Sequence, residues 1–337
     1  MPDWKQAPEG SNWGRWGRED ELGTLNFITQ DNRLAAVAEV KQGLAFCLSL
    51  PLDVPGAIRL NPRRHPPRLR PTFLGETPYI NYPLEKVDPI LQDVLSDDQV
   101  LLSTQFSTQW DSLAHVGAMF DADGDGMPEP VYYNGFRAGV DVLGEEADSL
   151  HGSFARKINV AGMAASALQG RGVLVDLVRA FGTDRRLVGH ADLERAIRDQ
   201  GVEIREGDIL VLRTGYAEAL LEMQSAPDPE RLDRTGAVLD GTDTALHRWI
   251  SESRIAAIAA DNYAVENPHT DPAACCLRLP LHHHCLFKLG MPLAELWYLK
   301  DLAEALAASG RHAMLLTAPP LRLPGAIGSP VTPVATI

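Results

Sequence analysis

The sequence is poor in cysteine and in positive charge, and each shortage excludes a class of protein. Its 337 residues include four cysteines, at positions 47, 275, 276 and 285, with no C-x-x-C pair. This pattern indicates neither a disulfide framework nor a zinc knuckle and favours a reducing compartment. The formal net charge is −14, from 31 Lys and Arg against 45 Asp and Glu. A nucleic-acid-binding protein needs a concentrated basic surface, so we expect no nucleic-acid partner.

Long apolar segments are also missing. There is no run of about 20 apolar residues that could span a membrane, and the N-terminus lacks the apolar region of a secretory signal. We therefore expect a soluble, cytoplasmic protein with no membrane partner.

Neither a G-x-S-x-G elbow nor a G-x-x-x-x-G-K-[ST] phosphate loop occurs, so the sequence supports neither a serine hydrolase nor a P-loop enzyme. The one basic run, residues 59–70, is rich in proline, which favours a surface arm or a subunit contact over an RNA site.

What the sequence does contain is a series of short apolar runs that alternate with helical patterns. The runs are rich in Val, Ile and Leu and have the length of buried strands; they cover residues 172–178, 207–215, 255–261 and 312–320. Helical spacing of apolar residues covers 191–201, 242–253 and a segment from about 301. Alternating strands and helices predict an α/β domain, although 207–215 could equally lie in an antiparallel pair. Residues 1–100 are expected to be an irregular wrap around the core.

The segment "STQWDSLAH", residues 107–115, carries the first group of candidate site residues. Asp111 offers an anionic oxygen, and His115 an imidazole that can bind metal or carry a proton near neutral pH. Such a pair, four residues apart, also occurs as a capping or buried polar pair. Gln105 and Gln109 offer neutral amide oxygens, which bind zinc more weakly than imidazole and suit harder ions such as manganese.

A second candidate cluster is "LHHHCLFKLGMPLAEL", residues 281–296. Histidine-rich tracts indicate metal binding only as a hypothesis. Consecutive residues cannot all face one point, so one of His282, His283 and His284 is the expected ligand. Glu295 lies too far along the chain to share a helix face with His282. The two can meet if a helix turns back into a strand.

Two further acidic segments remain open to more than one interpretation. Asp121, Asp123 and Asp125 match the first half of an EF-hand loop, but Tyr132 stands where the bidentate glutamate belongs, which favours a solvated acidic turn over a calcium site. In "AADNYAVENPH", Asp261, Asn262 and Glu266 follow an expected strand, where site residues and capping residues are equally common.

Together these segments resemble the cyclase family of metal-dependent hydrolases, which includes bacterial kynurenine formamidase and isatin hydrolase. The resemblance covers nearly the whole chain, in order. It rests on "SNWGRWGREDELGTLNFI", "QGRGVLVDL", "GVEIREGDILVLRTGY", "AADNYAVE", the His-to-Glu segment before "LWYL" and "LRLPGAIGSPVTP". It implies a swivelling β/β/α-type domain with a mixed β core flanked by helices. We expect one domain over 1–337, with 1–100 as the N-terminal wrap and 101–337 as the catalytic core. A homodimer or homotetramer is implied as well.

The family signature, H-x-G-T-H-x-D-x-x-x-H, implies roles for individual residues. Its aspartate falls on Asp111 and its catalytic histidine on His115, whereas Gln105 and Gln109 replace its two metal-binding histidines. The distal His and Glu ligands fall on His282, or a neighbour, and Glu295. One divalent ion would thus be held by Gln109, Asp111, His282 and Glu295, with Gln105 as a weaker fifth ligand. This oxygen-rich set favours manganese over zinc.

The resulting hypothesis is a metal-dependent hydrolase that cleaves a carbon–nitrogen or ester bond in a small aromatic or cyclic substrate. Asp111 helps to hold the metal and His115 moves the proton. Trp110, Tyr133 and Asn134 are the expected substrate-binding residues. Three alternatives stay open. The first is a metal-independent dehydratase or cyclase that uses His115 with Asp111, and the second is a non-catalytic small-molecule binder. A calcium-stabilised protein using the 121–126 loop is a third.

Overall fold

The structure is a computed structural model that describes residues 4–56, 60–144, 154–224, 226–269, 271 and 276–337. Arg59 of the basic run and Cys275 lie outside these residues. A nine-stranded mixed sheet forms the centre of the body. Its strands, in spatial order, are β1 (Ala45–Cys47), β21 (Val334–Thr336), β19 (Ala313–Thr317), β13 (Gln169–Asp176), β15 (Ile209–Arg213), β17 (Ala257–Ala260), β18 (Leu293–Glu295), β8 (Gln109–Asp111) and β20 (Gly328–Pro330).

The middle of this sheet is parallel and its two sides are antiparallel. Strands β13, β15, β17 and β18 run parallel to one another, so the antiparallel alternative for 207–215 is wrong. Strands β19, β21 and β1 continue antiparallel on one side, and β8 and β20 on the other. The four predicted strands and the α/β class are confirmed. Parallel strands need crossover connections, which the helices supply.

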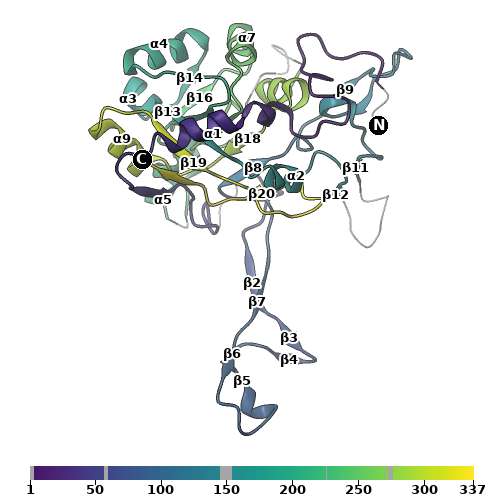
Figure 1. Cartoon of the computed structure of the whole chain (residues 1–337), viewed down its shortest axis with the longest axis vertical. Helices are drawn as coiled ribbons and strands as arrows, with labels where there is room; N and C mark the ends of the chain where they lie inside the picture. Colours follow the sequence, from purple (N-terminus) through teal and green to yellow (C-terminus); the bar gives the residue numbers. More distant parts are fainter. Residues whose placement is uncertain (1–3, 57–59, 145–153, 225, 270, 272–275) are drawn as a thin grey trace.

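Helices cover both faces of the sheet, as Figure 1 shows. They are α1 (Gln30–Val37), α2 (Val160–Ala165), α3 (Leu177–Phe181), α4 (His190–Gln200), α5 (Tyr216–Glu222), α6 (Pro229–Asp233), α7 (Thr244–Ser253), α8 (Pro280–His282) and α9 (Lys300–Ala308). The predicted helices correspond to α4, α7 and α9. Helix α4 ends at Gly201, whose φ of 70° is left-handed as a glycine stop requires. Helix α7 begins at Asp243, whose side chain accepts from the amides of Ala245 and Leu246.

Strand residues alternate between two separate cores. Leu174 and Val211 face one core, with Leu302 and Leu306 of α9. Val173 belongs to the other core, together with residues of α4 and α7. Because both faces of the sheet are buried, the strand sequences are continuous apolar runs that do not alternate with polar residues. None of the described helices is long and apolar enough to cross a bilayer.

The first 100 residues divide into a wrap and an arm. Helix α1 packs against β13 and β19, and β1 joins the edge of the sheet, so the wrap includes regular elements. Residues 68–101 instead project far from the body (Figure 1). The stem of this arm pairs β2 (Arg68–Pro71) with β7 (Asp98–Leu101). Its outer part pairs β3 (Phe73–Leu74) with β4 (Thr77–Pro78) and β5 (Tyr82–Pro83) with β6 (Val94–Leu95).

Among the described residues, three more two-stranded ladders lie on the body. They are β9 (Ala118–Phe120) with β10 (Glu129–Val131), β11 (Val142–Leu143) with β12 (Phe154–Ala155), and β14 (Arg186–Val188) with β16 (Ala237–Leu239). Single 3₁₀ turns occur at Gly23–Phe27, Leu84–Lys86 and Tyr133–Gly135. The division into a single domain stays a prediction.

Candidate functional site

The register between β8 and β18 brings polar side chains to one face of the sheet. Gln109 lies opposite Glu295, and Trp110 lies opposite Ala294. Side chains alternate along a strand, and residues directly opposite share a face. Gln109, Asp111 and Glu295 therefore point the same way, while Trp110 points to the other side. All four side chains are at most 2% exposed.

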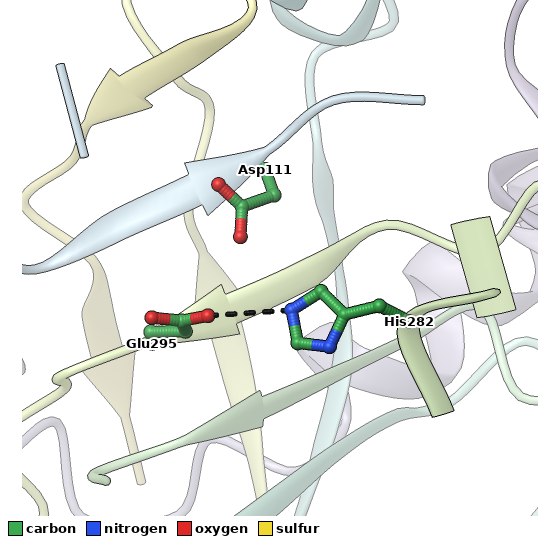
Figure 2. A group of neighbouring side chains, drawn as sticks. All are labelled: Asp111, His282 and Glu295. Carbon is green, nitrogen blue, oxygen red and sulfur yellow. Dashed lines mark ion pairs between the residues drawn. The ribbon is translucent and has the colours of Figure 1, made fainter. Parts of the chain in front are cut away.

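His282 reaches this face from a helix that turns back into β18. The short helix α8 ends at His282 and continues as a π-helix over His283–Leu289, four residues before β18. Figure 2 shows Asp111, His282 and Glu295 converging from these three elements. One potential ligand atom from each lies within 4.8 Å of the others. His282 Nε2 is 3.4 Å from Glu295 Oε1. The helix-to-strand turn expected from the sequence is thus present.

The chemistry of this group fits a divalent cation. Two carboxylates and one imidazole face a common point, and they are ligands that manganese and zinc both accept. Within the described residues, two buried oxygens at the site, Glu295 Oε2 and Gln109 Oε1, have no hydrogen-bond partner. Buried acceptors are seldom left unpaired because the loss of water is costly. A bound cation would satisfy the oxygen of Gln109, whereas Glu295 Oε2 lies 3.9 Å from Arg64 Nη1.

Glu266 orients the histidine of the group. Its Oε1 lies 2.8 Å from His282 Nδ1, and because a carboxylate accepts, Nδ1 carries the proton and Nε2 faces Glu295. Burial alone lowers the pKa of His282, but hydrogen bonds with Glu266 and Glu295 raise it to about 10. In the absence of a cation, His282 is therefore protonated and donates to Glu266 on one side and Glu295 on the other. Metal binding requires Nε2 to lose its proton, so it is accompanied by proton release.

His115 lies at the edge of the same group. Its Nε2 is 4.0 Å from Asp111 Oδ2, and its side chain is 21% exposed, whereas Asp111 is fully buried. Burial lowers the pKa of His115, although the charge of Asp111 opposes this shift. The imidazole is thus neutral near pH 7 and open to solvent on one side. It is able to accept a proton from a molecule beside Asp111.

Arg64 belongs to the basic run expected to be a surface arm or a subunit contact, but it lies at the site. Its Nη1 is 3.9 Å from Glu295 Oε2 and donates to the carbonyl of Gln105 at 3.0 Å. Burial raises the pKa of Glu295, but His282 and Arg64 together lower it below its usual value. The signal for Arg64 was its place within the basic run 59–70, which the proline-rich composition obscured.

The two glutamines of the signature differ in their surroundings. Gln109 is fully buried, and its Nε2 donates to Asp111 Oδ1 at 3.2 Å, which leaves its oxygen free. Gln105 is half-buried, and its Oε1 accepts from Thr104 Oγ1 at 2.8 Å. The oxygen of Gln109 is therefore available to a cation, whereas that of Gln105 is already engaged.

The expected substrate-binding residues make contacts with other parts of the chain, and their role stays a prediction. Trp110 packs edge-on against Trp297 in the core and donates from Nε1 to the carbonyl of Ala318 at 2.8 Å. Asn134 holds the N-terminal segment, accepting from the amide of Gly14 at 2.8 Å. Tyr133 donates to Asp20 in the same segment. Strand alternation turns the side chain of Trp110 away from Asp111, while Tyr133 and Asn134 contact the N-terminal segment.

The remaining polar candidates are also placed. His284 stacks on His247 with ring centroids 4.3 Å apart, and His283 lies against Phe287, so His282 alone of the three histidines joins the group in Figure 2. Asp261 accepts from the amides of Thr214 and Gly215, a structural role.

The 121–126 segment forms an acidic turn. Ligand atoms of Asp121, Asp123 and Asp125 lie within 4.8 Å of one another. Asp121 accepts from the amides of Gly124 and Gly126, as a solvated turn requires, and calcium binding there stays untested.

Comparisons with known proteins agree with this fold. The family described as "Putative cyclase" matches residues 48–267, a range that ends before His282 and Glu295. The crystal structure of a novel cyclase is 34% identical and covers 97% of this chain and 97% of its own, with a TM-score of 0.74. Isatin hydrolase A from Labrenzia aggregata is 16% identical, covering 91% of this chain and 98% of its own, with a TM-score of 0.54.

Isatin hydrolase A from Ralstonia solanacearum is 14% identical and covers 91% of this chain and 97% of its own, with a TM-score of 0.53. At these identities the two isatin hydrolases show a shared fold alone. No curated protein matches the sequence. The family match over most of the chain and the 34% identity to a solved cyclase show that this protein belongs to the cyclase family.

Proposed function

We propose that the protein is a metal-dependent hydrolase of a carbon–nitrogen or ester bond in a small aromatic or cyclic substrate. The observation that carries the proposal is the buried group of Asp111, His282 and Glu295, with one ligand atom of each within 4.8 Å of the others. The isatin hydrolase fold relatives support the reaction class. A formamide, another amide and a cyclic amide all fall within it.

One divalent ion, manganese or zinc, would be held by these three residues and by the free oxygen of Gln109. Gln105 joins them only if its amide leaves Thr104. When bound, such an ion polarises a carbonyl and lowers the pKa of water. The ligand set contains two carboxylates and one amide oxygen but only one imidazole. Oxygen ligands are hard, so this set favours manganese.

His115 is the proposed acid and base. Its neutral imidazole, 4.0 Å from Asp111, takes a proton from the attacking water and returns it to the leaving nitrogen or oxygen. Asp111 orients the ring and stabilises the imidazolium that forms. Arg64, close to Glu295, keeps that carboxylate ionised.

Metal content and turnover test the proposal separately. Elemental analysis of the untagged protein should find about one equivalent of manganese or zinc per chain, lost in Asp111→Ala and retained in His115→Ala. With isatin and formanilide as substrates, His115→Ala should reduce kcat by about 10²–10⁴-fold. His190→Ala, on α4, is the matched control. Metal-free protein that cannot be reloaded, or a fully active His115→Ala, would contradict the assignment.

A metal-independent dehydratase or cyclase is the second candidate. It is favoured by His282, whose charge between Glu266 and Glu295 already balances the site. Activity that survives exhaustive chelation would establish it. Tight binding of a small molecule with no turnover, and no effect of His115→Ala, would instead indicate a non-catalytic binder.

We also propose that the protein is a homo-oligomer in which the arm packs on a second copy of the chain. The arm exposes large apolar side chains, which include Leu69, Phe73, Leu74, Val87, Ile90 and Leu101. A lone two-stranded hairpin is marginally stable in water and needs a covering surface. The arm stem carries Arg68 and Arg70, which suits a partner with the net charge of −14 that a second copy has. Reciprocal arm exchange gives a closed, symmetric assembly.

Sedimentation analysis tests this assembly. Leu69 and Val100 lie opposite each other in the stem, and replacing both by Asp should convert a dimer or tetramer to a monomer. Leu187→Asp, at an exposed apolar position on the body, is the control. A wild-type protein that is monomeric at micromolar concentration would contradict the proposal.

A cytoplasmic location is proposed as well. It is supported by the described cysteines, Cys47, Cys276 and Cys285, which are all free, as is usual in a reducing compartment.

A further inference from the structure

A cavity of about 530 Å³ shares Tyr263 with a small pocket that contains Arg64, whose Nη1 is 3.9 Å from Glu295 Oε2. Two aromatic side chains, Tyr216 and Tyr263, line it. Its volume is in the range that holds small-molecule ligands. It is thus large enough for a single aromatic or cyclic molecule.

Two segments of the chain connect this cavity with Glu266 and His282. Pro268 and His269 follow Glu266 closely, and Arg278 and Leu279 lead into the helix that ends at His282; all four line the cavity. Tyr263 also lines the small pocket that contains Arg64 and Gln105. The segments that position Glu266 and His282 therefore form the cavity wall as well.

The wall carries more positive than negative charge. Arg63, Arg185 and Arg278 come from three separate segments, and Asp233 is the one carboxylate among the lining residues. Asp233 Oδ1 is 3.9 Å from His269 Nε2. Across the described part of the chain, none of the three arginines forms an ion pair with a carboxylate. This is notable in a chain with 45 acidic residues.

Arg185 is the most enclosed of the three. It is half-buried, whereas Arg63 and Arg278 are exposed. Burial lowers the pKa of the Arg185 guanidinium, although the charges of Tyr216 and Asp233 oppose the shift. A guanidinium presents a planar fork of donors that matches a carboxylate. No carboxylate of the described residues lies within ion-pair distance of this fork, so an anionic ligand would find free donors there.

We propose that this cavity binds the carboxylate of the substrate, with Arg185 as its principal contact and Arg63 and Arg278 at the entrance. The substrate class narrows to small aromatic or cyclic amides or esters that carry a carboxylate. Asp233 in the same wall favours a monoanion over a phosphate dianion, since like charges repel. Tyr216 and Tyr263 provide faces for the ring. This inference rests on the proposed function for its reaction, but the binding step does not need turnover.

Binding of benzoate and its neutral isostere benzamide, followed by calorimetry, tests the proposal. Both metal-loaded and chelator-stripped, dialysed protein are titrated, because a carboxylate could also bind a metal directly. Benzoate should bind about tenfold more tightly than benzamide in both forms. Arg185→Gln should abolish that preference while benzamide binding stays within about twofold. Arg234→Gln, with a 73% exposed side chain beside Asp233, is the charge-matched control and should change neither.

Three results would overturn the proposal: equal binding of the two probes, a benzoate preference present only in the metal-loaded form, and an unchanged preference in Arg185→Gln. Should Arg185→Gln fail to fold, Arg278→Gln, at an exposed position, should still weaken benzoate binding selectively. A protein that prefers benzoate but hydrolyses nothing would refute the hydrolase function and leave the anion site intact. The two failures are thereby distinguished.

Discussion

Glu266 and His282 form a fully buried pair whose Oε1 and Nδ1 atoms are 2.8 Å apart. The same carboxylate accepts from the backbone amides of Leu281 and His282, at 2.9 and 2.8 Å. Three hydrogen bonds thus fix the start of the helical segment and the orientation of the imidazole together. This is the arrangement of a carboxylate that supports a metal-binding histidine.

Glu266→Gln should weaken metal binding by about 10–100-fold, because the amide cannot accept at all three donors or raise the basicity of His282. Competition with a fluorescent chelator measures the affinity for manganese and zinc. Glu304→Gln, at an exposed position on α9, removes the same charge and should have no effect. Unchanged affinity in Glu266→Gln would show that His282 is not a ligand.

Gln109→His should raise the affinity for zinc by at least about tenfold, since imidazole is a stronger zinc ligand than an amide oxygen. The side chain at this position is buried beside Asp111, and the change restores the histidine of the family signature. Competition titrations with zinc and manganese measure the change in preference. Gln99→His, on the exposed arm strand β7, is the control. A zinc affinity equal to that of the wild type would place residue 109 outside the ligand set.

Trp110→Ala should lower the free energy of unfolding by about 3–5 kcal/mol, because it empties a large core volume and leaves the carbonyl of Ala318 unpaired. Denaturant unfolding measures the loss. Trp110→Phe should keep most of the packing against Trp297 and leave KM within about twofold, since the ring does not face the site. A large rise in KM for the Phe variant would instead support the substrate-binding role expected from the sequence.

Asp261 should make the stability of the protein depend on pH. Burial raises its pKa to about 7, although hydrogen bonds from Thr214 and Gly215 oppose the shift; an unfolded chain has an Asp pKa of about 3.9. Between these values the folded protein keeps a proton that the unfolded chain has lost. The free energy of unfolding therefore falls as pH rises from about 4 to 7, by up to about 1.4 kcal/mol per pH unit.

Urea unfolding of wild type and Asp261→Asn across this range isolates the contribution of Asp261. The difference between their unfolding free energies should change with pH, because the amide does not titrate. Asp240→Asn, at a half-buried surface position, should follow the wild-type profile over the same interval. A constant difference for Asp261→Asn would mean that the aspartate stays ionised throughout.

Local sequence patterns were enough to predict those helices and strands whose burial and capping depend on residues of the same element. The apolar runs at 172–178 and 255–261 form β13 and β17, and Gly201 ends α4 at a left-handed φ. These strands could be predicted because a strand buried on both faces is a nearly continuous run of apolar residues. Local patterns could not predict that β15 is parallel to its neighbours. Strand direction depends on the path of the connecting chain, and the same residues suit a parallel or an antiparallel ladder.

For the site, the sequence by itself determined the residue types: a signature with Asp111 and His115, amides in place of two histidines, and a distal His and Glu. Only the tertiary structure decided which of them meet. It selected His282 from three neighbouring histidines and added Glu266 and Arg64. It also turned Trp110 into the core and extended residues 68–101 as an arm. The register between distant strands and the rotation of the helices fix these contacts. Neither can be recognised from a local sequence pattern.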